Sequence, residues 1–552
     1  MMRRTVVASF LLLTAPLSML AQSAPTRADA EKDPVLRAML AEMDRSRQQL
    51  QLQGFDKPYF MEYRIDDMAQ YEAEAEYGAL TTEHESHSRL VRVTVRVGDY
   101  KSDSSSVRGD GSLDIAAIEN DPLAIRYALW TATDMAYKAA LDAWAAKQAE
   151  LKSVQTPPQS DDFSHQKPVI DLEPAAAIDL DRETWKHSIV DGSGLYSSDP
   201  AAKAFVDQIE VSRGSVEARV RTEYLVNTEG TIVRASSPQY HAEVAVEAQA
   251  SDGMRLERSY PVAATTAAGL GSADAFHHGV LEALDGLHKL RDAPVVTDEY
   301  HGPVLFSGNA AARSFDEYFA RAVAASRPQM GSTARTTGPF ASSYNTRVLP
   351  DFMKIVDDPG LTEFNGKALL GAYKVDDEGV PAQSVTLIDS GKLVGYLMGR
   401  EPIRDFPESN GHGRAPVAQP ARSHIGVLHV EATGGLSQDD LVKKLISMGK
   451  DQGLEFVYLL QTKSSQTEPR TLYRIKVADG SKELVRGARL GDVDLRSFRS
   501  DIVAAGSDAY VDNMFGDVPA TIIAPPLLFD DVTVKHGEER NEKLPYYPPP
   551  SQ

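Results

Sequence analysis

The spacing of apolar residues predicts long helices and strands in the first half of the chain. Residues 32–51 place Leu36, Met39, Leu40, Met43 and Leu50 on one stripe, which is typical of an amphipathic helix. Residues 90–97 alternate between apolar and polar, which predicts a half-buried strand. Residues from about 121 to 151 predict a long helix. Its core-facing stripe is expected to contain Trp130, Thr133, Tyr137, Leu141 and Trp144.

The order of these elements favours an α+β class. Residues 216–227 and 230–235 predict a strand pair joined by a turn, and residues 273–290 predict another helix. Antiparallel hairpins outnumber β-α-β patterns, so we expect residues 32–298 to form a mixed α/β domain with antiparallel strands and long helices. The Pro-, Ser- and Asp-rich residues 153–174 predict an exposed linker within this domain.

The second half of the chain has a different pattern. Residues 300–536 contain short strands, many Gly and Asp turns and few helices, which predicts a β-rich C-terminal domain. The runs 385–388 and 392–397 flank Asp389-Ser390-Gly391 and predict a hairpin. Residues 537–552 are charged and then Pro-rich, so we expect a disordered tail.

The first residues resemble a secretory signal. Arg3-Arg4 precede the apolar run 6–13, and the small residues Ala21 and Ser23 follow it, so residues 1–23 are predicted to be a cleaved signal peptide. The run is too short for a convincing membrane span. We therefore expect an exported protein, in the periplasm or outside the cell, with no membrane span after cleavage.

Composition excludes some chemistry. The chain has no cysteine, which removes thiolate metal ligands, cysteine nucleophiles and disulfides. Its formal net charge is −21 at pH 7, which argues against nucleic acid and anionic membranes as partners.

An ordered set of motifs lies in the second half. Residues 302–306 predict a buried strand that breaks at Ser307-Gly308-Asn309 and leads into a helix. Residues 371–381 follow, then the hairpin, then the loop 409–414. This set resembles the C-terminal half of the TldD/PmbA family, described as zinc metalloproteases that work as a two-protein complex. The resemblance covers nearly the whole mature chain and is most specific over residues 350–422 and 523–530.

The resemblance implies a lost metal site. In the catalytic branch the helix carries HExxxH, and its two His positions fall on Ser307 and Ala312 while its Glu falls on Gly308. The family's further ligand is a cysteine, which this chain lacks. The chain therefore resembles the metal-ligand-less, PmbA/TldE-like branch, and no cofactor is expected. The implied function is that of a non-catalytic subunit that pairs with an HExxxH-bearing relative, with itself, or with both, and helps a zinc protease degrade unfolded peptides.

The same resemblance implies where an extended peptide would bind. Asn410, Gly411, His412 and Arg414 form a loop that family analogy places near the peptide cleft. Arg414 would contact a carboxylate or carbonyl of the peptide, and an ordinary surface arginine is the alternative.

Two other functions stay open, so the sequence does not decide whether the chain is an enzyme. The first is a metallopeptidase with a displaced zinc site, for which His412, His424 and His429 are the candidate ligands. If residues 84–87 continue the strand pattern, His84 and His87 point to opposite faces and would not chelate together, whereas a loop would leave the question open. The second is a solitary envelope protein that binds peptides.

Three further motifs have ordinary structural interpretations. The acidic run Asp376-Asp377-Glu378-Gly379 predicts a turn rather than a metal site, because Asp and Gly suit bends. Ser307 lies at a strand-to-helix turn but lacks the G-x-S-x-G pattern of a nucleophilic serine. His278 and Glu282 are expected to form a solvated pair on a helix.

Overall fold

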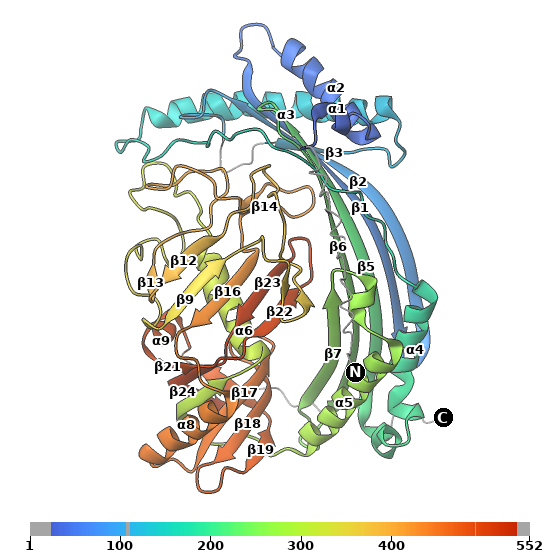
Figure 1. Ribbon diagram of the computed structural model, residues 1–552, viewed down its shortest axis with the longest axis vertical. Helices are drawn as coiled ribbons and strands as arrows, with labels where there is room; N and C mark the ends of the chain where they lie inside the picture. The colour runs from blue at the N-terminus through green and yellow to red at the C-terminus, as the bar shows by residue number, and fades with distance from the viewer. Residues whose placement is uncertain (1–23, 106–110, 492, 538–552) are drawn as a thin grey trace, which may run out of the picture.

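The computed structural model describes residues 24–105, 111–491 and 493–537 (Figure 1). The predicted signal peptide, residues 1–23, and residues 538–552 of the predicted tail lie outside the described residues. Among the helices that are described, none is both long enough and apolar enough to cross a membrane.

A long, curved sheet forms the N-terminal part (Figure 1). Its strand order is β3-β2-β1-β5-β6-β4, and β7 pairs with β6. All neighbours are antiparallel except β4 and β6. The strands are β1 (Pro58–Glu76), β2 (Ala79–Val97), β3 (Gly111–Ile115), β4 (Ile170–Leu172), β5 (Ile209–Asn227), β6 (Ile232–Gln249) and β7 (Arg255–Ala264).

Helices cover one face of this sheet in two groups. The helices are α1 (Arg27–Ala30), α2 (Pro34–Gln49), α3 (Pro122–Leu151), α4 (Arg182–Ser198) and α5 (Ala273–Asp292), with 3₁₀ turns at Ala202–Gln208 and Ala267–Leu270. The first three form one core with the sheet at one end, and α4 and α5 form a second core at the other end. The predicted helices at 32–51 and 273–290 are confirmed as α2 and α5.

The strand period of two sends alternate residues to opposite faces. On β1, Tyr63 and Ile65 pack in the helix-covered core, whereas Arg64 and Asp66 point to the other face. There they contact the C-terminal domain through Gln419 and Ala418. The sheet therefore has an apolar face under the helices and a charged face under the second domain.

The predicted core stripe of α3 is wrong at one position. Thr133, Tyr137 and Leu141 are buried, but Trp130 is 46% exposed. The face that lies on the sheet is instead rich in alanine, namely Ile125, Ala128, Leu129, Ala132, Ala136 and Ala140. Small side chains allow the helix to lie close to the valines of β2, and Trp130 lies at the flank of this contact.

Two sheets build the C-terminal part. One has the order β13-β12-β9-β16-β23-β22, and the other has the order β19-β18-β17-β8-β24-β20, with β21 paired to β24. The strands of the first are β9 (Met353–Asp357), β12 (Val385–Asp389), β13 (Lys392–Leu393), β16 (Val427–Ala432), β22 (Tyr510–Met514) and β23 (Ala520–Ala524). Those of the second are β8 (Tyr300–Phe306), β17 (Phe456–Lys463), β18 (Pro469–Lys476), β19 (Lys482–Val485), β20 (Ala488–Gly491), β21 (Ile502–Ala505) and β24 (Leu527–His536).

A core lies between these sheets and includes α6. The remaining elements are α6 (Asn309–Phe315), a π-turn (Asp316–Ala320), α7 (Arg321–Val323), α8 (Gln438–Asp451), α9 (Leu495–Ser500) and the short ladders β10 (Glu363–Phe364), β11 (Lys367–Ala368), β14 (Gly413–Arg414) and β15 (Arg422–Ser423). Residues of α6 pack with both sheets in one core, while α8 covers the outer side of β8 and β17. The predicted hairpin at 385–397 is confirmed, with positive φ at Ser390 (46°) and Gly391 (73°) as such tight turns require.

The α+β class is confirmed by this mixture of antiparallel sheets and helices. The predicted exposed linker, residues 153–174, needs a correction. Asp162, Phe163 and Ser164 are buried, because the Phe163 ring lies between the guanidinium groups of Arg96 and Arg400 at 4.0 Å from each. The polar composition of residues 153–174 does not reveal that one aromatic residue, Phe163, anchors this segment in the fold.

Close contact between α3 and the sheet gives a testable consequence. Replacing Ala136 (1% exposed) by Leu inserts a larger side chain between helix and sheet and should lower the free energy of unfolding by about 1–3 kcal/mol. The same change at the exposed Ala139 of the same helix should leave it within about 0.5 kcal/mol. Urea unfolding followed by circular dichroism measures both. Equal effects at the two positions would contradict this account of the packing.

Candidate functional site

The strand–turn–helix at the end of β8 is the first part of the site. The backbone N–H of Ser307 donates to the carbonyl of Leu460 at 2.8 Å, so the turn is anchored on β17. Gly308 then has φ +56° and ψ −134°, a backbone conformation that disfavours residues with a Cβ. A Cβ at Gly308 would also lie 3.4 Å from the carbonyl of Gln461. The turn before α6 is therefore a tight, defined structure.

The first turns of α6 are buried and apolar. Ala310, Ala311 and Ala312 are each fully buried in the core between the two sheets. The methyl group of Ala312 offers no donor atom for a metal, and a lone serine hydroxyl is a poor zinc ligand. The zinc implied by the family's catalytic branch does not fit these residues. Over the described ranges, no group of three or more His, Cys, Asp or Glu is arranged to hold a metal.

Two ion pairs flank this helix. Arg313 Nε lies 3.0 Å from Asp512 Oδ2 on β22, and Lys463 at the end of β17 pairs with Glu317. Burial raises the pKa of the Asp512 carboxyl, although Arg313 opposes the shift. Burial also lowers the pKa of the Lys463 ammonium, although Glu317 opposes this shift. These pairs hold α6 against both sheets with charges rather than with a metal.

The predicted peptide-binding loop turns inward. His412 is fully buried, with Nε2 3.1 Å from Asp357 Oδ1 and Nδ1 3.0 Å from the backbone carbonyl of Asn410. The Asn410 side chain accepts from the N–H of Met398 at 2.8 Å and donates to the carbonyl of Tyr396 at 2.9 Å. These polar groups are already engaged inside the fold, so the loop's role in peptide binding stays a prediction.

The other candidate ligands do not converge with His412. Both ring nitrogens of His412 face acceptor oxygens, so neither turns a lone pair toward an open site. His424 Nδ1 contacts the Ile425 carbonyl at 2.9 Å, and His429 lies on β16 beside Glu431. Burial lowers the pKa of both His424 and His429.

Two weaker histidine patterns behave as predicted. His84 and His87 both lie in β2, where their spacing places them on opposite faces of the strand. His278 Nδ1 lies 3.4 Å from Glu282, and both side chains are at least 70% exposed. Neither pattern gathers a set of metal ligands.

Arg414 is also an interior residue rather than a surface arginine. Its Nε donates to Asp377 Oδ2 at 3.3 Å, and its guanidinium lies 4.0 Å from the ring centroid of Tyr373. Asp377 Oδ2 also accepts from the N–H of Ala415 at 2.6 Å. Burial by itself would raise the pKa of Asp377, but the charges of Arg414 and Arg221 outweigh it and hold that pKa below its usual value.

The acidic run forms the predicted turn, and the turn is buried. Gly379 has φ +76°, and its N–H donates to the carbonyl of Asp376 at 3.0 Å. The Asp376 carboxylate accepts from the N–H of Gly413 at 2.8 Å, while Glu378 Oε2 accepts from the N–H of Arg400 at 2.7 Å. Burial raises the pKa of Asp376 well above its usual value and that of Glu378 to about 7. The turn joins two loops of the C-terminal domain.

Arg221 links this region to the N-terminal sheet. Its Nε donates to Asp66 Oδ1 at 2.8 Å, its Nη2 donates to Glu223 Oε2 at 2.6 Å, and its Nη1 donates to the carbonyl of Ala415 at 2.9 Å. Asp66 Oδ2 accepts from the N–H of Ala418 at 2.8 Å. We call Arg64, Asp66, Arg221, Glu223, Asp377 and Arg414 the interdomain ion cluster.

Arg400 makes a second link to the N-terminal sheet. Its Nη2 donates to Glu229 Oε1 at 2.9 Å and to the carbonyl of Ser164 at 2.6 Å. Its guanidinium lies between the rings of Phe60 and Phe163, at 5.0 and 4.0 Å from their centroids. The side chain is fully buried, so this contact is part of the fold.

Sequence reasoning missed the interdomain ion cluster. The signal was present in β1 and β5, where Arg64 and Asp66, and likewise Arg221 and Glu223, are charged residues two apart in one strand. Such spacing places both charges of a pair on one face. It does not reveal which distant loop covers that face.

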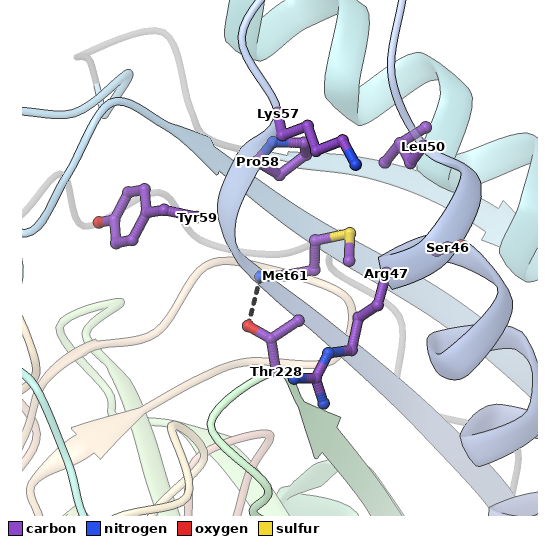
Figure 2. A pocket seen from close by; sticks show the side chains of 8 residues that line it. All are labelled: Ser46, Arg47, Leu50, Lys57, Pro58, Tyr59, Met61 and Thr228. Carbon is purple, nitrogen blue, oxygen red and sulfur yellow. Dashed lines mark hydrogen bonds between the residues drawn. The ribbon is translucent and has the colours of Figure 1, made fainter.

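Two pockets lie on the N-terminal part, away from the strand–turn–helix. One of about 230 Å³ lies between the end of α2 and the start of β1, with the basic residues Arg47 and Lys57 at its rim (Figure 2). Within it the N–H of Met61 donates to Thr228 Oγ1 at 3.0 Å. The other, of about 370 Å³, contains a contact of 2.5 Å between His87 and Asp67. No residue of the strand–turn–helix or of the 410–414 loop lines either pocket.

Comparison with known proteins matches this geometry to one family. Residues 297–536 match the family model of the PmbA/TldA metallopeptidase C-terminal domain. The C-terminal part of the chain, residues 297–536, belongs to this family. A curated protein from Archaeoglobus fulgidus, described as a metalloprotease, is 26% identical over 175 residues. That match covers 31% of this chain and 35% of the relative, so it spans about a third of the relative's length.

Solved structures share the fold over most of the chain. TldE from Thermococcus kodakarensis has a TM-score of 0.59 at 14% identity and covers 90% of this chain and 100% of its own. A Thermotoga maritima protein, described as a proposed modulator of a DNA gyrase, has a TM-score of 0.60 at 14% identity, with coverage of 90% and 99%. At these identities the likeness shows the fold alone. The fold shared with these structures therefore extends beyond residues 297–536.

The buried acids predict how stability depends on pH. Burial, with the charge of Asp377, raises the pKa of Glu223 to about 8, and burial raises that of Glu378 to about 7. The folded state therefore keeps protons that the unfolded state releases. Stability should be highest below about pH 4.5 for these two groups and fall as pH rises to about 8, by on the order of 3–5 kcal/mol for each group. Asp377, with its lowered pKa, acts in the opposite sense below about pH 4.

Urea unfolding between pH 5 and 9 measures this dependence. Glu223→Gln should flatten the decline between about pH 7 and 8, whereas Glu282→Gln at an exposed helix position should keep the wild-type profile. An unchanged slope in Glu223→Gln would show that Glu223 is not the group that titrates.

Proposed function

We propose that this chain is a non-catalytic subunit of a TldD/PmbA-type metallopeptidase assembly, partnered with an HExxxH-bearing relative. The proposal rests on which residues stand at the motif positions around α6 and on how deeply the helix is buried. Ser307, Gly308 and Ala312 occupy the HExxxH positions. Ala312 is fully buried in an apolar core. A hydrolytic zinc site needs convergent donor atoms and an open position for water, and this helix supplies neither.

The fold also suggests how such a subunit would take up a peptide. Strand β22 is an edge of its six-stranded sheet in the described part of the chain, and Asp512 on it pairs with Arg313 of α6. An extended peptide can add to an exposed strand edge through backbone hydrogen bonds. We propose β22 as the edge that presents an extended, unfolded peptide beside the strand–turn–helix.

Export is part of the same proposal. The basic residues Arg3-Arg4, the apolar run 6–13 and the small residues Ala21 and Ser23 support a signal peptide. The assembly would then work in the periplasm or outside the cell. With zero cysteines the exported chain would have no disulfides, so its stability would come from core burial.

The competing functions receive less support. A displaced zinc site would need His412, His424 and His429 to converge, but His412 is engaged by Asp357 and His429 lies beside Glu431 on β16. A solitary peptide-binding protein would use the same β22 edge but would need no protease partner. The presence or absence of complex formation separates it from the subunit that we propose.

Reconstitution with the HExxxH-bearing relative from the same genome tests this proposal. The purified chain alone should not hydrolyse unfolded peptides, and the two proteins should co-elute in size-exclusion chromatography and hydrolyse them together. Replacing the Glu of the relative's HExxxH by Gln should abolish the activity of the complex, because that Glu is the general base.

A matched change in this chain serves as the control. Ser307→Ala removes the hydroxyl at the motif position and should leave hydrolysis by the complex unchanged. Chelator-sensitive hydrolysis by the chain alone would contradict the proposal, and so would loss of activity in Ser307→Ala. Failure of the two proteins to associate would favour the solitary peptide-binding protein.

A further inference from the structure

Exposed apolar side chains concentrate in one short stretch. Of the twelve large hydrophobic residues that are exposed in the described structure, seven fall within residues 113–135. They are Leu113 (53%), Ile115 (73%), Ile118 (48%), Leu123 (73%), Tyr127 (64%), Trp130 (46%) and Met135 (52%). Single exposed apolar residues are ordinary, but a concentration of this kind marks a surface that meets another molecule.

Three of these residues form one stripe on α3. Leu123, Tyr127 and Trp130 stand at positions i, i+4 and i+7, which places them on one side of the helix. The rings of Tyr127 and Trp130 are in contact, with centroids 5.3 Å apart. This is the spacing by which an amphipathic helix anchors itself in a partner's groove, and Tyr and Trp are the residues that dominate such contacts.

Leu123, Tyr127 and Trp130 are not on the sides of α3 that pack against the sheet or α2. The sheet-facing side of α3 is the separate alanine-rich face, with Ala132 and Ala136 buried against β2. The side toward α2 is held by Arg126, whose Nε lies 3.1 Å from Glu42 Oε2. The stripe thus lies on a third side of the helix and contributes little to the core.

The charges beside the stripe define the partner's chemistry. Glu119 and Asp121 are exposed at its N-terminal end, and Asp134 follows at its other end, paired with Lys138. The net charge there is negative, as it is for the whole chain. A second copy of this chain would bring acidic flanks against acidic flanks, and an anionic membrane would be repelled in the same way.

We propose that Leu123, Tyr127 and Trp130 form a docking stripe for a partner protein with an apolar groove rimmed by lysine or arginine. The stripe lies on the helix-covered face of the N-terminal sheet, whereas the C-terminal domain with α6 contacts the opposite face through Arg64 and Asp66. A protein bound there leaves the strand–turn–helix and β22 free. This goes beyond the proposed function, because it assigns the chain a second and separate interaction surface.

A synthetic probe reproduces the partner's chemistry. The probe is a helical 18-residue peptide with leucine on one face and lysine on the other, and its counterpart carries glutamate in place of lysine. Titrating the lysine peptide into the full chain should shift the fluorescence of Trp130 to shorter wavelength as the ring is covered. Trp130→Phe assigns the signal, because the chain has only two other tryptophans, the half-buried Trp144 and the buried Trp185.

Matched variants separate docking from general charge attraction. Leu123→Ser combined with Tyr127→Ser should weaken binding at least about tenfold. Leu52→Ser combined with Leu80→Ser removes two exposed apolar residues elsewhere and should leave binding unchanged. Circular dichroism confirms that each variant is folded, and all four substituted positions are exposed.

Four results would overturn the proposal. These are equal binding of the glutamate peptide, no binding of the lysine peptide up to about 100 µM, and equal weakening by both pairs of variants. The fourth is a Trp130 emission that shifts to longer wavelength when residues 1–23 are removed. That last result would show that the chain's own basic and apolar N-terminal segment covers the stripe. Self-association lost in the Leu123/Tyr127 variant, without peptide binding, would identify a second copy as the occupant instead.

Discussion

The contact of Arg221 with Asp66, Glu223 and the carbonyl of Ala415 determines how the two halves of this protein meet. A guanidinium buried to this degree is tolerated only when each of its donors has a partner. Here the partners come from β1, β5 and the loop that follows Arg414. Removing one partner would leave a buried charge unpaired, which typically costs about 3–5 kcal/mol. The loop, and the acidic turn beneath it, are therefore fixed relative to the sheet.

This constraint explains why the loop 410–414 resembles a ligand-binding site in sequence but makes internal structural contacts in the fold. A histidine, an asparagine and an arginine between glycines suggest ligand binding. In the fold, His412 contacts Asp357 and Arg414 donates a hydrogen bond to Asp377. Asn410 hydrogen-bonds to the backbone of Met398 and Tyr396. Each group satisfies another buried polar group of the same chain. Polar residues in a family's signature loop are therefore also required by the domain contact.

Much of the fold was predictable from local patterns. The stripe of Leu36, Met39 and Met43, the strand at 90–97 and the Ser390-Gly391 turn each depend on neighbours in sequence, and each was found where predicted. The strand is not half-buried as its alternation predicts, because Arg92, Thr94 and Arg96 on its polar face are buried as well. What failed depended on distant partners. Trp130 was assigned to the core because the spacing on α3 does not reveal which side lies on the sheet, and Phe163 was assigned to an exposed linker because its partners Arg96 and Arg400 are far away in sequence. In the candidate site, the strand–turn–helix and the acidic turn were predictable from local sequence, whereas the buried partners of His412 and Arg414 were not.

The account depends on α6 being a packed core helix rather than an incomplete metal site. Ala310, Ala311 and Ala312 fill space between two sheets, and the pairs Arg313–Asp512 and Lys463–Glu317 flank the helix. The most direct measurement is the zinc content of the purified protein, by elemental analysis after brief dialysis without chelator. The account predicts less than about a tenth of an equivalent, because structural and catalytic zinc sites hold their metal tightly. Near-stoichiometric zinc, lost on His412→Ala or His429→Ala, would contradict it.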